Sequence, residues 1–340
     1  MHCELVVPGL LPPRGQTGAT PGTRALEVML GRARRSHSDR LTLEDWLQAG
    51  FGHSNGPLPA GALTLRGAGR DPGSAFWVRL DPVHLQLGRD SLTLLPAGVF
   101  QIQHEEAAQL CASLGSHFAE RLELLPVTPD RWCARLHSAL DAGNSPPIAL
   151  CGLNVDEHLK SGDMPAAWHA FLNEAQMLLH LNPVNEAREA RAERAINSVW
   201  PWGAGRACGT LAAPWQSVAA DELIALGLAR AAKARVLGLA SSAAEWVSAA
   251  GIDGRHLAVL DALRVPLALG DQAAYAEALE KLERNWFAPL LGMLRESRIG
   301  MLSIHVPDAA RCASFETVRG DLRRIWRRAR PLSAYALDFE

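Results

Sequence analysis

One stretch of the chain collects side chains that could bind an anion. The segment LNPVNEAREARAERAINSVWPWGAG, residues 181–205, joins a charged run, a short apolar strand at 196–200 and a Trp-Gly-x-Gly turn. Guanidinium groups bind carboxylates and phosphates through paired N–H bonds, amides add donors, and indole rings provide flat apolar walls. The candidate ligand-binding residues are Asn185, Arg188, Asn197, Trp202, Gly203, Gly205 and Arg206. The alternative is structural: the asparagines turn the backbone and the tryptophans fill a domain junction.

A second candidate set follows the apolar run IGMLSI. His305, Asp308 and Cys312 lie just beyond a predicted strand, where α/β proteins place functional groups. Nitrogen, oxygen and sulfur donors suit zinc, so these three could hold a single metal ion. Their spacing matches no zinc signature, and the pattern favours a structural role with no metal.

Two basic runs, RARRSHSDR at 32–40 and RRIWRRARP at 323–331, are the third candidate. With Trp326 among its arginines, the second run could bind an anion or nucleic acid. It also ends a predicted helix, where cations complement the helix dipole. The formal net charge of −2 provides no wider basic field, which favours solvated helix ends and no nucleic-acid partner.

The composition and the motifs that are absent exclude several classes of protein. The 340 residues are 48% hydrophobic and 21% charged, as in a globular protein of roughly two domains. No apolar run reaches the ~18–20 residues of a membrane span, and the first residues lack a signal-peptide pattern, which predicts a cytoplasmic location without membrane contact. The six cysteines contain no CxxC pair, and no GxSxG, HExxH or nucleotide-binding glycine motif occurs.

The order of elements predicts two domains. An apolar strand at 5–7 is followed by a loop rich in proline and glycine, and Thr23 is expected to cap the next helix. Helices are expected at 24–35, 41–51, 105–122, 221–232, 241–251, 272–297 and 316–330. Strands are expected at 62–67, 75–80, 83–88, 91–95, 122–127, 132–137, 234–239, 256–261 and 299–306. Apolar strands that alternate with helices indicate a parallel sheet, here formed by both chain ends around an inserted α+β module.

Two segments resemble one protein family. NPVNEAREARAERAINSVWPWGAG is similar to the HPVNxxRxxxGxxxANxxWxxGxG stretch of archaeal-type cofactor-independent phosphoglycerate mutases. MLSIHVPDAARCASFETVRGDLRRI is similar to their HVxxPDxxGHxGDxxxKxxxI stretch. VVPGLLPP and RLDPVHL further resemble the bacterial RpfE-type regulatory proteins. The resemblance implies an α/β fold with an alkaline-phosphatase-like parallel-sheet core, residues 1–55 and 205–340, and an inserted α+β domain, residues 56–204.

The chain departs from the family pattern at residues that the family uses for catalysis. The family carries a metal-ligand Asp after its first strand, where this chain reads Val7-Pro8-Gly9. Thr42 is the hydroxyl closest to the position of the nucleophilic serine, and Cys312 replaces a metal-ligand His, although Asp308 remains. A two-metal site needs several carboxylates and imidazoles to hold its ions ~3.5–4 Å apart.

The resemblance therefore implies a pseudoenzyme with no expected cofactor. Its predicted role is regulatory: it binds a small anionic, phosphorylated metabolite or a protein partner. The alternative is a metal-dependent phosphomutase or phosphatase that uses a single ion at His305, Asp308 and Cys312. A purely structural or interaction module is the third interpretation.

Overall fold

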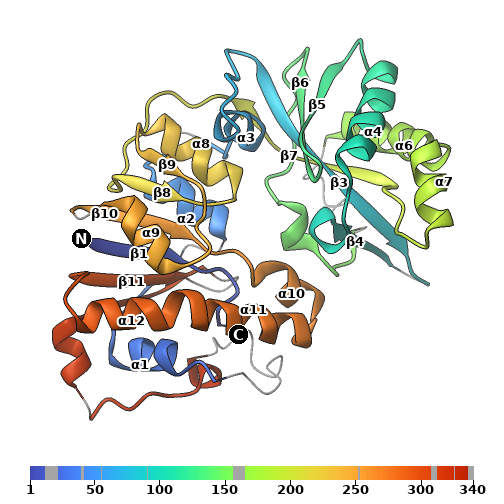
Figure 1. Cartoon of the computed structure of the whole chain (residues 1–340). Helices are drawn as coiled ribbons and strands as arrows, with labels where there is room; N and C mark the ends of the chain where they lie inside the picture. The colour runs from blue at the N-terminus through green and yellow to red at the C-terminus, as the bar shows by residue number, and fades with distance from the viewer. Residues whose placement is uncertain are drawn as a thin grey trace. The chain divides into compact units, whose positions relative to one another are not determined.

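The chain forms two compact units (Figure 1). The core unit contains Met1–Ser54 and Thr210–Glu340, and the inserted unit contains Asn55–Gly209. The computed structural model describes residues 1–11, 22–39, 42–54, 56–89, 91–155, 165–251, 253–307, 312–324 and 326–335. None of the helices in these ranges combines the length and apolar content that a membrane span requires.

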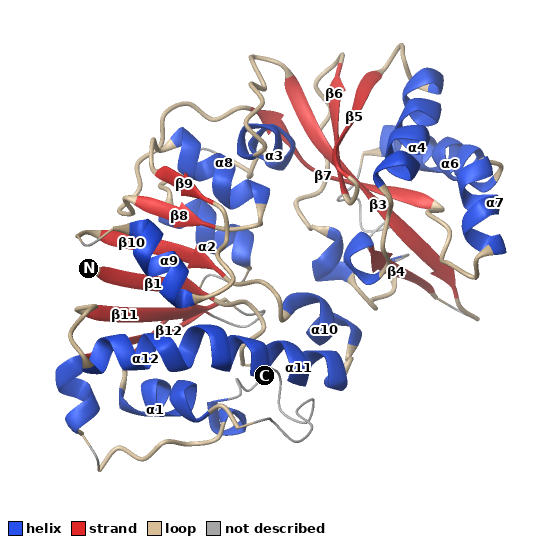
Figure 2. Cartoon of the chain, viewed as in Figure 1, coloured by secondary structure: helices blue, strands red, loops and turns tan. Residues whose placement is uncertain are grey.

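A seven-stranded mixed sheet organises the core unit, in the order β2-β12-β11-β1-β10-β8-β9 (Figure 2). Its parallel strands are β1 (His2–Val6), β8 (Ser217–Ala219), β9 (Arg235–Leu237), β10 (Arg255–Val259) and β11 (Met301–Val306). Its antiparallel strands are β2 (Arg34–Ser38) and β12 (Cys312–Val318). The predicted parallel-sheet core is thus confirmed, with two antiparallel strands added at one edge.

Helices cover both faces of this sheet. They are α1 (Arg24–Arg32), α2 (Leu43–Gly50), α8 (Leu223–Ala231), α9 (Ala243–Ala250), α10 (Arg264–Leu269), α11 (Gln272–Leu282) and α12 (Ala288–Arg295). Side chains alternate along a strand, so Cys3 and Leu5 of β1 join the main apolar core with α1, α9, α11 and α12. The intervening Glu4 faces the other side, where Trp46 of α2 stacks beside His305 of β11. One face of the sheet is therefore apolar, whereas the other carries charged groups.

The predicted helix at 272–297 is interrupted. Between α11 and α12 the residues Glu283–Phe287 form a π-helical turn, directly before Pro289. Proline lacks an N–H and its ring clashes with the carbonyl four residues earlier, so the wider turn accommodates it. The carboxylate of Glu283 accepts hydrogen bonds from the backbone N–H groups of Ala25 and Leu26, at 2.6 and 3.2 Å. Thr23 occupies the N-cap position of α1, as expected, but its side chain forms no capping hydrogen bond, and the Glu283 carboxylate caps the helix instead.

The helix predictions at both basic runs are wrong in part. Residues 34 and 35, expected at the end of a helix, begin strand β2, and residues 316–318, expected to start a helix, end strand β12. Among the described residues after β12, 3₁₀ turns form at Arg319–Arg323 and Leu332–Tyr335. The antiparallel pairing of β2 with β12 decides the outcome, because strand propensity depends on the partner strand more than on local composition.

The inserted unit contains a five-stranded antiparallel sheet. Its strands are β3 (Phe76–Leu87), β4 (Leu92–Pro96), β5 (Leu122–Thr128), β6 (Arg131–Leu136) and β7 (Ser198–Arg206). Its helices are α3 (Ala60–Gly67), α4 (His104–His117), α6 (Ala166–His180) and α7 (Pro183–Ala190), with 3₁₀ turns at Ala97–Val99 and Pro147–Leu150. The α+β prediction for this module is confirmed.

Three local predictions in the inserted unit are wrong. Residues 62–67 form helix α3, in which every residue of 60–65 is buried, so the run lacks the one-sided burial of a strand. The runs at 75–80 and 83–88 are one strand, β3, which passes through Pro82. The expected Trp-Gly-x-Gly turn is the continuous strand β7, paired with β3 across a register shift.

Position 203 of β7 requires glycine for two reasons: its backbone conformation and the close approach of a neighbouring residue. Its φ is +59°, and a Cβ atom there would overlap Ala60 of α3. We expect Gly203→Ala to lower the free energy of unfolding by about 2 kcal/mol or more, because strain and overpacking add. Urea denaturation measures the loss. Gly209→Ala is the control, since a Cβ at Gly209 meets nothing within 4 Å, and an equal loss in both variants would refute this explanation.

Candidate functional site

The two predicted asparagines bind backbone. Asn185 in α7 is buried; its amide donates to the carbonyls of Leu179 and Ile196, at 2.8 and 2.9 Å, and its oxygen accepts from the Ile196 N–H at 2.8 Å. Asn197 donates to the Leu85 carbonyl at 2.8 Å and accepts from the Leu85 N–H at 2.7 Å. Both side chains hold the start of β7 in place.

Arg188 is the most deeply buried cation among the candidates, with 1% of its surface exposed. Its guanidinium lies 2.5 Å from Glu106 of α4 and donates to the carbonyls of Arg194 and Gln101, at 2.7 and 3.0 Å. These contacts occupy all three nitrogens of the guanidinium. Arg188 joins α4 and α7 inside the unit.

The remaining candidates lie along β7. Trp202 is buried and its indole N–H donates to Asp81 at 2.7 Å, while Arg206 bonds the Ser74 carbonyl. Gly205, like Gly203, lies against α3, and a Cβ there would come 2.9 Å from Pro59. The polar groups of this predicted set are used within the inserted unit, and its ligand-binding role stays a prediction.

The described residues at the end of β1 supply no metal ligand. At the end of β1, Val7 is fully buried and apolar, and Gly9 has no side chain. The Thr42 hydroxyl accepts a hydrogen bond from the Asp45 N–H at 3.0 Å and so caps α2. Within the described ranges, no three His, Cys, Asp or Glu side chains are grouped to hold a metal ion.

The structure describes two of the three residues predicted to hold a single metal ion. His305 Nδ1 lies 2.8 Å from the Ser314 hydroxyl, and Cys312 is buried at the start of β12. Asp308, with residues 309–311, lies outside the described residues. The set of His305, Asp308 and Cys312 therefore stays a prediction, as does the expected absence of a cofactor.

A buried carboxylate in the middle of the sheet was not predicted. Glu4 of β1 is 2% exposed, and its Oε1 accepts from Arg255 Nε of β10 at 2.6 Å. Its Oε2 lies 3.7 Å from His305 Nε2, and His2 Nδ1 lies 3.5 Å from Oε1. Burial alone would raise the pKa of Glu4, but contacts from His305, Arg255 and Trp215 outweigh it and lower the pKa to about 2. Glu4 is thus an ionised group that ties three strands together.

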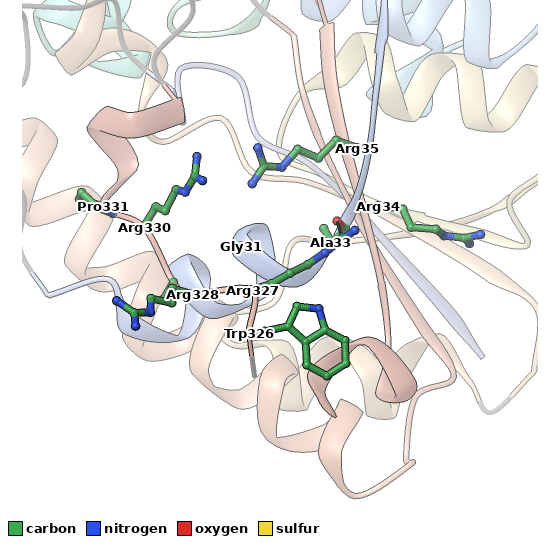
Figure 3. Close-up of a pocket in the computed structure, with 10 residues that line it drawn as sticks. Gly31, Ala33, Arg34, Arg35, Trp326, Arg327, Arg328, Arg330 and Pro331 are labelled. Atoms are coloured by element: carbon green, nitrogen blue, oxygen red, sulfur yellow. Dashed lines mark hydrogen bonds between the residues drawn. The ribbon is translucent and has the colours of Figure 1, made fainter. Parts of the chain in front are cut away.

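A hollow with ligand-binding chemistry lies in the core unit, where the two basic runs meet (Figure 3). We call it the arginine hollow; its volume is about 880 Å³. Its lining residues are Gly31, Ala33, Arg34, Arg35, Trp326, Arg327, Arg328, Ala329, Arg330 and Pro331. Five of these ten are arginines, and none is acidic.

Local contacts hold residues 326–331, the C-terminal strap, against α1 and β2. Gly31 permits the close approach, since a Cβ there would come 2.8 Å from the Arg328 carbonyl oxygen. The Arg327 guanidinium donates to the Ala33 carbonyl at 3.2 Å. Shortly before the strap, the Leu322 carbonyl accepts from Arg32 at 2.6 Å. Arg327 is thus one arginine of the hollow with a structural contact that fixes the strap.

The arginines of the hollow differ in their partners. Arg34 points away from the others in Figure 3 and lies 3.3 Å from Glu316. The guanidinium ends of Arg35 and Arg330 point toward each other, and the Arg35 guanidinium lies 4.6 Å from the Tyr335 ring centre. Burial raises the pKa of Tyr335. The positive charges of Arg35 and Arg330 both oppose that rise, so both guanidinium groups act on the same hydroxyl. Within the described part of the chain, neither Arg328 nor Arg330 forms an ion pair with a carboxylate.

The comparisons with known proteins bear on the fold. The sequence matches no protein-family model and no curated protein. Among solved structures it is similar to the PH0037 protein from Pyrococcus horikoshii, with a TM-score of 0.55 and 15% identity over 93% of this chain and 87% of that one. It is also similar to cofactor-independent phosphoglycerate mutase from Thermoplasma acidophilum, with a TM-score of 0.44 and 15% identity over 94% and 90% of the two chains. The first likeness extends over both units, so the chain shares the fold of that protein: a mixed α/β architecture with a largely parallel sheet and a second, antiparallel sheet.

Proposed function

We propose that this chain is a binding protein for a small phosphorylated anion, which it holds in the arginine hollow. The observation that carries the proposal is a hollow whose described lining residues include five arginines and no carboxylate. Guanidinium groups offer paired N–H donors that match phosphate oxygens, and like charges gathered in a hollow attract an anion. A regulatory role fits a protein that binds such a metabolite without transforming it.

The strand-end residues support binding over phosphoryl transfer. Such transfer depends on groups that position and neutralise the phosphate, usually metal ions with several carboxylate and imidazole ligands. At the end of β1 the chain places Val7 and Gly9, and Thr42 caps a helix. These side chains supply neither metal ligands nor an activated nucleophile.

The test is calorimetric titration of the full chain at low ionic strength with pyrophosphate and with a panel of phosphorylated metabolites. We expect saturable binding, weakened by roughly 100-fold or more in the double variant Arg328→Ala/Arg330→Ala, because charge-assisted hydrogen bonds contribute about 1.5–3 kcal/mol each and every 1.4 kcal/mol is tenfold. Raising the salt concentration should weaken binding as well, since the site is exposed.

Arg298→Ala is the matched control. Arg298 is exposed in the same unit but lies outside the hollow, 3.8 Å from Glu296. Its replacement should leave the affinity unchanged. Absence of binding at millimolar anion, or equal weakening by the control, would refute the proposed site.

A further inference from the structure

The arginine hollow contains an aromatic group as well as cations. Trp326 is 75% exposed, whereas the other nine tryptophans of the chain are at most 7% exposed. A large apolar ring kept in solvent marks an interaction site more often than an isolated exposed leucine does. The exposed indole is therefore part of what the hollow presents to a ligand.

The indole and the cations occupy different parts of the hollow. In Figure 3, Trp326 lies at one end of the lining residues, and Arg35 and Arg330 lie at the other. A ligand that contacts both ends needs a flat ring and a separate group with several negative charges. A volume of about 880 Å³ accommodates a molecule of that size, since small-molecule sites measure roughly 300–1,000 Å³.

We propose that the ligand of the arginine hollow is a nucleotide with two or more phosphates. Its base stacks on Trp326, and its phosphates bind the guanidinium groups of Arg35, Arg328 and Arg330. Stacking on an indole suits any base, because every base has a flat face, and it adds to the electrostatic binding of the phosphates. The inference rests on the proposed function and names the chemical class of its ligand.

The experiment compares ADP, adenosine and pyrophosphate by calorimetric titration against the full chain. We expect ADP to bind more tightly than pyrophosphate by roughly 5- to 100-fold, the range that one base stacked on an aromatic side chain provides. Trp326→Leu should abolish that difference and leave pyrophosphate binding unchanged, whereas Trp326→Phe should retain part of it. Arg328→Ala/Arg330→Ala should weaken ADP and pyrophosphate alike.

The outcomes separate this inference from the proposed function. If pyrophosphate binds and ADP binds no more tightly, or if Trp326→Leu weakens both equally, the nucleotide is refuted while the anion site stands. If none of the three binds, both proposals fail. If a single-stranded oligonucleotide such as dT8 binds far more tightly than ADP at low salt, the surface serves a polymer and the nucleotide is refuted.

Discussion

Replacing Arg188 by alanine should lower the free energy of unfolding of the inserted unit by about 3–5 kcal/mol, the cost of leaving a buried ion pair half complete. Arg188 is 1% exposed and lies 2.5 Å from Glu106, which is itself largely buried. Without the guanidinium, the Glu106 carboxylate and the carbonyl of Gln101 lose a donor inside the unit. Urea denaturation followed by circular dichroism measures the effect.

Arg191→Ala is a matched control for this prediction. Arg191 contacts the same carboxylate, at 2.6 Å, but is 48% exposed and also pairs with Glu193. Exposed pairs contribute about 0–1 kcal/mol, so the control should change little. Similar small losses in both variants would show that Arg188 has little structural importance and would favour its predicted ligand-binding role.

Protonation of Glu4 should account for much of the acid sensitivity of the core unit. The pKa of Glu4 is lowered from 4.5 to about 2, which corresponds to on the order of 3 kcal/mol at neutral pH. Because the folded state holds the carboxylate ionised, this stabilisation is complete above pH 4.5. It is lost as the pH falls from there toward about 2, where the folded state also takes up the proton.

Urea denaturation at steps between pH 6 and pH 2 checks this expectation. Glu4→Gln should unfold more easily at pH 6 and show a shallower loss of stability on acidification, so the two proteins converge at low pH. Glu296→Gln, which replaces an exposed carboxylate 3.8 Å from Arg298, should keep the slope of the unmodified protein. Parallel slopes for Glu4→Gln and the unmodified protein would refute the assignment.

Four of the five parallel strands of the core unit could be predicted from the sequence because they are apolar and alternate with helices, whereas the three-residue strand β8 was missed. The runs at 234–239, 256–261 and 299–306 all contain strands. By contrast, β2 consists of RRSHS, and all five of its residues are exposed. Its strand structure comes from pairing with β12, which lies far away in the sequence. The local sequence of β2 gives no information about that partner strand.

The candidate site was harder to predict for a related reason. Asn185 and Arg188 carry the donors that a ligand site needs, but the same donors satisfy buried backbone carbonyls. The sequence alone cannot distinguish the two uses. The arginine hollow was predicted only in part. The second basic run, with Trp326 among its arginines, was named as a possible anion site, but the balance of charge favoured solvated helix ends, and local patterns gave no sign that the two runs meet.

The contact between the C-terminal strap and the end of α1 has a thermodynamic consequence. Arg327 and Ala33 are 294 residues apart in the chain, yet one hydrogen bond joins them beside the arginine hollow. An anion that touches both halves acts as a reversible cross-link across almost the whole polypeptide. Only the folded chain forms such a site, so every tenfold rise in ligand above its dissociation constant adds about 1.4 kcal/mol to the stability of the core unit. Ligand binding in the hollow would thus raise the free energy of global unfolding of this unit.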